Sequence, residues 1–103
     1  MERLRWEPRR RPDGPIISTR NQLVKEFVAL HEARGRRERG LVLVEGPTLV
    51  TEAVTAGLDV EVACTTDPER WPDATPVEPR VLARMSTTTT PNEIVAIVHR
   101  PAE

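Results

Sequence analysis

The stretch LVLVEGPTLVTEA, from Leu41 to Ala53, contains the junction on which the fold depends. Its first four residues, Leu41–Val44, form a short and continuously apolar run, which is typical of a strand buried on both faces. Gly46 allows a tight turn, and Pro47 suits the first position of a helix because the missing N–H would have no partner there. We therefore expect a strand that passes directly into a helix, which Gly57 ends.

Patterns upstream of this junction predict another helix. Thr19 and Gln22 have the spacing of a capping box, so a helix is expected to begin there. Ser18 with Asn21 is the alternative pair. Apolar residues follow at helical spacing, and Gly35 is the expected stop.

Downstream, the sequence predicts four further elements and a polar loop. They are a strand around Val60–Cys64, a very short strand at Val77, a helix over Pro79–Met85, a loop over Ser86–Asn92 and a last strand over Ile94–Val98. Strands that alternate with helices favour a largely parallel sheet covered on both faces. The expected fold class is therefore α/β, a three-layer α/β/α sandwich with a mostly parallel sheet.

The composition indicates a cytoplasmic protein with no membrane contact. The chain has 103 residues, enough for one hydrophobic core, and 30% of them are charged. No apolar run approaches the length that crosses a membrane, and no apolar stretch follows the basic N-terminus, so it is not a secretory signal. Cys64 is the only cysteine, which excludes an intrachain disulfide and fits a reducing compartment.

Charge is distributed unevenly along the chain. Residues 1–40 carry 11 Lys/Arg and 6 Asp/Glu, whereas residues 41–103 carry 4 and 10, so the net charges are +5 and −6. A basic end favours a nucleic-acid contact. The alternative is an arginine-rich tail beside a solvated helix face, and charge alone favours that alternative. Prolines and three consecutive arginines predict a flexible basic arm over residues 1–15, ahead of a domain over residues 16–103.

The sequence offers no self-contained catalytic or metal site. His31, His99 and Cys64 lack the spacing of a zinc site, and neither a phosphate-binding glycine loop nor a Ser, His and acid trio is present. Each histidine is expected at the surface or at a helix end, and Cys64 in the core. Glu45 follows a strand, where α/β folds place functional groups, but a carboxylate stabilised by the helix dipole is the alternative.

Basic and amide side chains gather at two places. Arg20, Asn21 and Lys25 lie at the start of the first helix. The second place is an expected loop, Arg34–Gly40, with four arginines: Arg34, Arg36, Arg37 and Arg39. Such side chains suit contacts with phosphates and 2′-hydroxyls. Because aromatic residues for base stacking are scarce, RNA binding would depend on backbone and shape and would weaken with salt.

Three motifs in order resemble the N-terminal substrate-binding domain of SpoU/TrmH-type RNA 2′-O-ribose methyltransferases. They are ISTRNQLVK (residues 17–25), RRERGLVLVEGP (residues 36–47) and TTPNEIVAIV (residues 89–98), and the likeness covers about residues 16–101. Three residues depart from the family pattern: Gln22 stands where Pro is common, Val42 where an aromatic is common, and Glu93 where Gly is common.

The resemblance implies a ribosomal-protein-like fold and an RNA-binding site. Glu45 and Gly46 would form a turn at the RNA-facing or interdomain edge, so Glu45 would not be a catalytic base. The residues then expected at the RNA are Arg20, Asn21, Lys25, Arg34, Arg36, Arg37 and Glu45.

The family's catalytic half is a knotted domain that binds S-adenosylmethionine, and it would begin where this chain ends. The resemblance therefore implies a substrate-recognition module without a cofactor of its own. Its partners would be RNA, an rRNA first and a tRNA second, and a C-terminal methyltransferase domain. The parent enzyme would be a dimer, and this domain a monomer or weak dimer. The alternatives are a free-standing ribosomal-protein-like RNA-binding adaptor and a protein-interaction domain.

Overall fold

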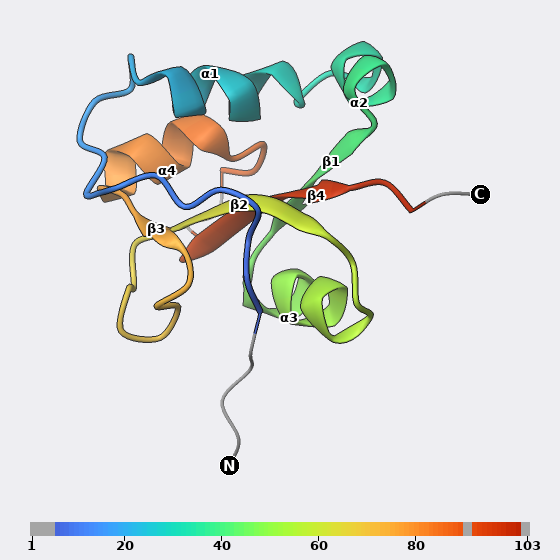
Figure 1. Ribbon diagram of the computed structural model, residues 1–103. Coiled ribbons are helices and arrows are strands. Elements are labelled where there is room, and N and C mark those ends of the chain that lie inside the picture. Colours follow the sequence, from blue (N-terminus) through green and yellow to red (C-terminus); the bar gives the residue numbers. More distant parts are fainter. Residues whose placement is uncertain (1–5, 90–91, 102–103) are drawn as a thin grey trace.

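The computed structural model describes residues 6–89 and 92–101. Its elements are α1 (Gln22–Ala29), α2 (Ala33–Arg39), β1 (Leu41–Glu45), α3 (Pro47–Thr55), β2 (Val60–Thr65), β3 (Thr75–Pro76), α4 (Pro79–Met85) and β4 (Ile94–His99). The four strands form one sheet in the order β1-β4-β2-β3 (Figure 1). The expected strand-to-helix junction is confirmed, with Gly46 at φ 92° and Pro47 in the first turn of α3.

The sheet is mixed, so the prediction of a mostly parallel sheet is wrong. β4 lies between β1 and β2 and is antiparallel to both, and only β2 and β3 are parallel. In a parallel sheet, the helix after each strand must return the chain to the end of the sheet at which that strand began. Instead, Thr87 follows α4 and donates its N–H to Glu45 at the end of β1. The chain therefore enters β4 at the carboxyl ends of β1 and β2.

Helices cover both faces of the sheet (Figure 1). α1 and α4 pack on one face over a core that contains Phe27 and Met85, and α3 packs on the other over a core that contains Trp71. β4 contributes to both, because Ile97 points into the first core and Val98 into the second. Each large side chain of this kind contributes about 1.5–3 kcal/mol when fully buried.

β1 is a half-exposed edge strand, although its apolar run predicted burial on both faces. All five of its residues are partly exposed. Leu41 and Leu43 pack against the core under α1, and Val42 and Val44 against the core over α3. Both faces are therefore apolar as expected, but only β4 lies beside the strand, and the outer edge leaves each side chain partly in solvent.

The arginine-rich segment after α1 is a second helix, so the prediction of a loop there is wrong. Gly40, at φ 65°, ends α2, while Gly35 lies inside it. Gly35 allows a close approach between chain segments, because a Cβ there would lie 2.1 Å from the carbonyl oxygen of Ala29. The cap of α1 also differs from both predicted pairs, since the Asn21 side chain accepts the Leu23 N–H.

Residues 6–15 lie against the sheet instead of extending away from it, and residues 1–5 of the expected arm lie outside the described residues. The Arg9 and Arg10 N–H groups donate to the carbonyls of Val60 and Glu61, both at 2.9 Å. The Arg10 guanidinium contacts Glu26 at 2.8 Å and Glu61 at 2.5 Å. This segment therefore covers the part of the β2 edge that the short strand β3 leaves open.

Gly35→Ala should destabilise the fold by about 1–3 kcal/mol, because the added methyl group overlaps the end of α1. Urea unfolding measures the loss. Gly57→Asn is the control: no neighbour lies within 4 Å of a Cβ there, and its φ of 78° suits Asn. That variant should lose less than about 1 kcal/mol, since Asn tolerates the left-handed region. Equal losses in the two variants would contradict the close approach.

Stability should fall as the pH drops below about 4.5, the usual pKa of a glutamic acid. Burial alone would raise the pKa of Glu61, but hydrogen bonds from His99 and Arg10 lower it overall. A lowered folded-state pKa contributes stability above the unfolded-state pKa, and that contribution is lost during acidification. Unfolding measured from neutral to acidic pH should show a smaller loss in Glu61→Gln than in Glu52→Gln, the exposed control on α3.

Candidate nucleic-acid interface

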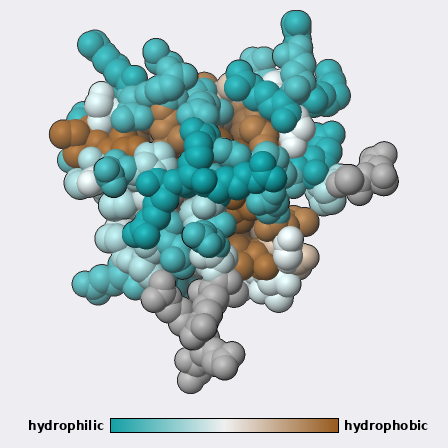
Figure 2. All heavy atoms as spheres, viewed as in Figure 1, coloured by the Kyte–Doolittle hydropathy of each residue, from teal (hydrophilic) through white to brown (hydrophobic). Residues whose placement is uncertain are grey.

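Charge is divided between two parts of the fold. Residues 41–78, which include β1, α3, β2 and β3, carry eight acidic side chains and a single basic one, Arg70. Three helices and the turn before α1 show the opposite bias. We call their basic residues the basic layer: Arg20, Lys25, Arg34, Arg36, Arg37, Arg39, Arg80 and Arg84. Hydrophilic side chains gather over α1 and α2 in Figure 2.

α1 and α4 form the base of this layer and run side by side in the same direction (Figure 1). At their starts, the Arg80 guanidinium donates to the Ile17 carbonyl at 2.8 Å. At their ends, His31 Nε2 donates to the Met85 carbonyl at 2.7 Å. The expectation that His31 is a helix-end partner is therefore confirmed, and the two helices are held together at both ends.

α2 extends the layer beyond the end of α1. Arg36 joins the two helices, since its Nη1 donates to the Leu30 carbonyl at 3.0 Å and to the His31 carbonyl at 3.2 Å. These carbonyls lie just after the last residue of α1, where no helical N–H remains to satisfy them. Arg36, an expected RNA contact, therefore already has a structural task. Arg34 forms an exposed pair with Glu38 at 2.8 Å.

Five members of the layer are exposed and have no side-chain partner among the residues that the structure describes. They are Arg20, Lys25, Arg37, Arg39 and Arg84. An exposed cation that is not paired within the protein can contact an external anion without breaking a bond. Three of the five were predicted from sequence as RNA contacts. Arg39 belongs to the arginine run, and Arg84 on α4 was missed because no local pattern places it beside α1.

The structure places the two predicted basic clusters on one layer but does not merge them. Arg20 and Asn21 precede α1, and α2 follows it, so the length of an eight-residue helix, roughly 12 Å, separates them. Asn21 has a local task as well, because its carboxamide oxygen caps α1 at 2.9 Å from the Leu23 nitrogen.

Glu45 lies apart from the arginines, at the opposite end of β1 from α2. Its Oε1 accepts the Thr87 N–H at 2.9 Å, and its Oε2 accepts the Thr87 hydroxyl. Both oxygens thus hold the segment after α4 against the end of β1. This arrangement suits a carboxylate that shapes an edge of the domain.

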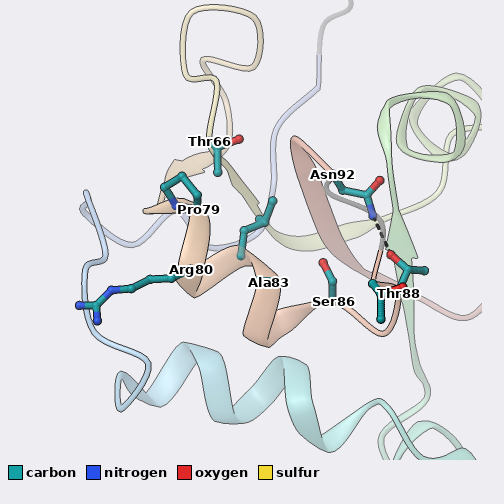
Figure 3. Close-up of a pocket in the computed structure, with 9 residues that line it drawn as sticks. Thr66, Pro79, Arg80, Ala83, Ser86, Thr88 and Asn92 are labelled. Atoms are coloured by element: carbon teal, nitrogen blue, oxygen red, sulfur yellow. Dashed lines mark hydrogen bonds between the residues drawn. The ribbon is translucent and has the colours of Figure 1, made fainter.

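A hollow of about 480 Å³ opens near this end of β1, between α4 and the segment that follows it (Figure 3). Its lining combines apolar groups such as Leu82 with the hydroxyls of Ser86 and Thr88. Asn92 points toward Thr88 and donates to its hydroxyl at 3.3 Å. The threonine-rich run after α4 is the sequence signal for this hollow, but the sequence alone indicates only a polar loop there.

Glu93, one of the departures from the family pattern, has a clear structural reason. Its carboxylate accepts the indole N–H of Trp71 at 2.9 Å and a bond from Arg70 at 2.5 Å. Its backbone carbonyl accepts the Thr65 hydroxyl at 2.7 Å and the Thr66 N–H at 3.0 Å. Glu93 therefore fastens the segment after β2 to the start of β4, which a glycine could do only through its backbone.

The remaining candidates have structural surroundings. Cys64 is buried as expected, and burial raises the pKa of its thiol to about 12. His99 Nε2 donates to Glu61 at 2.8 Å. Within residues 6–89 and 92–101, no three side chains are grouped so that they could hold a metal ion. Over the same residues, every helix is too short or too polar to cross a membrane.

Solved structures share this fold. An rRNA methyltransferase from Sinorhizobium meliloti superposes with a TM-score of 0.75 at 20% identity, over 87% of this chain and 38% of that one. A TrmH-family protein from Porphyromonas gingivalis gives a TM-score of 0.64 at 30% identity, over 78% and 35% of the two chains. A structure described as an RNA 2′-O ribose methyltransferase gives 0.72 at 24% identity, over 85% and 38%.

Sequence comparison agrees. An uncharacterized tRNA/rRNA methyltransferase of Synechocystis is 32% identical over 96 residues, which cover 79% of this chain and 34% of the relative. The chain therefore spans about a third of the length of this relative. Residues 21–96 match the family described as the MRM3-like substrate binding domain. Because that match includes most of the chain, together with all four strands up to the middle of β4, the protein belongs to the family of MRM3-like substrate binding domains.

Proposed function

We propose that this chain is the RNA-recognition domain of a SpoU/TrmH-type 2′-O-ribose methyltransferase that acts on rRNA or tRNA. The observation that carries the proposal is the separation of charge. Exposed, unpaired cations lie on α1, α2 and α4, whereas residues 41–78 are acidic. The family and the names of its relatives supply the substrate class.

The basic layer would bind RNA mainly through phosphates. Arg20 lies just before α1, Lys25 on α1 and Arg37 on α2, so a strand of RNA laid along these helices would meet several cations in turn. The acidic part of the fold would repel RNA and thereby orient the domain on its substrate. Both effects are electrostatic, so the affinity would depend steeply on salt.

The other expected contacts would act with these cations. Arg34 can exchange its exposed partner Glu38 for a phosphate, because a surface pair of this kind contributes at most about 1 kcal/mol. Asn21 and Arg36 would keep the ends of α1 in place while offering their remaining N–H groups. Glu45 would shape the edge next to the hollow, at the RNA or at a neighbouring domain.

The parent protein would contain a C-terminal methyltransferase domain that holds S-adenosylmethionine, since the relatives are about three times as long as the matched region. Residues 16–103 would form the substrate domain, in the three-layer, ribosomal-protein-like arrangement, and residues 1–15 a basic extension along it. Transfer of the methyl group would take place in the catalytic domain, and this chain would bind and orient the RNA. Such an enzyme would work in the cytoplasm.

Lys25→Ala combined with Arg37→Ala should weaken binding of a large-subunit rRNA stem-loop. If each cation contacts one phosphate, the slope of log affinity against log salt should fall by roughly 1.4–1.8. Fluorescence anisotropy at several salt concentrations measures both affinity and slope. Unfolding curves should remain unchanged, because both side chains are exposed and unpaired.

The matched control is Thr48→Glu combined with Thr51→Glu, two exposed positions on α3. This variant lowers the net charge by the same amount on the other face of the sheet, so it should affect the affinity only slightly. Equal weakening by the two double variants would show that net charge alone drives binding. An unchanged affinity in the first variant would exclude the basic layer as the interface.

A further inference from the structure

The two edges of the sheet are protected to different degrees. Along the edge formed by β2 and β3, the backbone of Arg9 and Arg10 bonds to β2, and the Ile16 N–H donates to the Pro76 carbonyl of β3 at 2.9 Å. Along the outer edge of β1, no backbone segment of the described chain forms a bond. One edge is therefore covered by the chain itself, and the other is open.

The backbone groups that β1 turns outward follow from its ladder with β4. The Arg100 N–H donates to the Gly40 carbonyl and the Gly46 N–H donates to the Ile94 carbonyl, each at 2.9 Å. Bonded pairs in an antiparallel ladder occur at every second residue, so the even-numbered residues of β1 face β4. The residues whose N–H and C=O groups point outward are Leu41, Leu43 and Glu45.

This open edge lacks the features that usually prevent strand pairing. Natural edge strands carry lysines, prolines, bulges or inward charges that discourage a second strand. Leu41–Val44 contains none of these, its pairing with β4 is regular, and every residue is aliphatic and partly exposed. An apolar and regular edge of this kind is suited to a partner strand.

We propose that β1 pairs antiparallel with β1 of a second copy of this chain, about a two-fold axis at Leu43. The outward residues are symmetric about that position, so Leu41 would oppose Glu45 of the second copy and Leu43 would oppose its equivalent. Three such pairs form roughly six backbone hydrogen bonds. The strand is thus its own complement, which favours a second copy over an unrelated strand.

Charge at the two ends of β1 supports the same arrangement. Arg37 and Arg39 of α2 precede the strand, and Glu45 ends it. Antiparallel pairing brings the basic end of each copy to the acidic end of the other, whereas a parallel arrangement would bring like charges together. A contact through one five-residue strand is small, so the dimer is weak and depends on concentration.

The pairing would also enlarge the basic layer. An axis perpendicular to the sheet keeps α1 and α4 of both copies on the same face of one continuous sheet. Two basic layers would then lie side by side and could follow a longer RNA than one domain can. The pairing itself depends on the backbone of β1, so the dimer can be tested without RNA.

Hydrogen exchange followed by NMR over a wide range of protein concentrations tests the register. Amides of Leu41, Leu43 and Glu45 should exchange rapidly in dilute protein and several-fold more slowly in concentrated protein. Amides of Val42 and Val44 should be protected throughout. Analytical ultracentrifugation should show the shift from monomer to dimer over the same range. A protein that remains monomeric, or a dimer that leaves the three outward amides unprotected, would overturn the proposal.

Two substitutions and one control substitution separate this dimer from other associations. Arg39→Glu replaces the basic residue two positions before Leu41, the partner of Glu45 in the second copy, with an acid, and should weaken association several-fold. Arg84→Glu, the same change at another exposed and unpaired arginine on α4, should have much less effect. Leu43→Pro removes an outward N–H, leaves the ladder with β4 intact and should abolish the dimer if the variant folds. Equal effects of the two charge reversals would contradict the proposed register, and the exchange pattern of the unaltered protein decides if Leu43→Pro does not fold.

Discussion

The position of β4 between β1 and β2 is the constraint on which the rest of the structure depends. Its residues Ile94–Val98 are all buried, and their side chains alternate between the cores under α1 and over α3. Because β4 begins at the carboxyl ends of both neighbours, the segment between α4 and β4 must lie at that end of the sheet. The bonds of Thr87 with Glu45 and of Glu93 with Trp71 then hold this segment in place.

The helices that cover the first core also carry the cations proposed to bind RNA. Their inner sides supply Phe27 and Met85 to the core, which leaves Lys25 and Arg84 on the outer sides. Packing therefore holds these two short amphipathic helices in place and leaves their basic side chains in solvent. Arg36 shows that one cation of this group serves the fold, by satisfying carbonyls at the end of α1. The same residue type thus has different tasks on neighbouring turns.

The sheet edges relate the fold to assembly. The segment around Arg9 and Arg10 occupies one edge and is neutralised there by Asp59, Glu26 and Glu61, so part of the basic charge of the N-terminal region is already used inside the molecule. β1 leaves the other edge open. Because only the β1 edge of the sheet can accept a further strand, each copy can pair with one other copy at that edge. This favours a closed pair over an extended chain of copies.

The sequence by itself determined the helices and strands whose signals are local. Gly46 and Pro47 specify the start of α3, and Pro79 specifies the start of α4. The three motifs identify the family. Caps, periodicity and motifs all depend on residues that lie close together in the chain. The same local reasoning placed a stop at Gly35, which instead serves a contact with Ala29. Only the tertiary structure decided the direction of β4, the half-exposure of β1 and which arginines are free. Those features rest on contacts such as Glu45 with Thr87, 42 residues apart, which no pattern along the chain records.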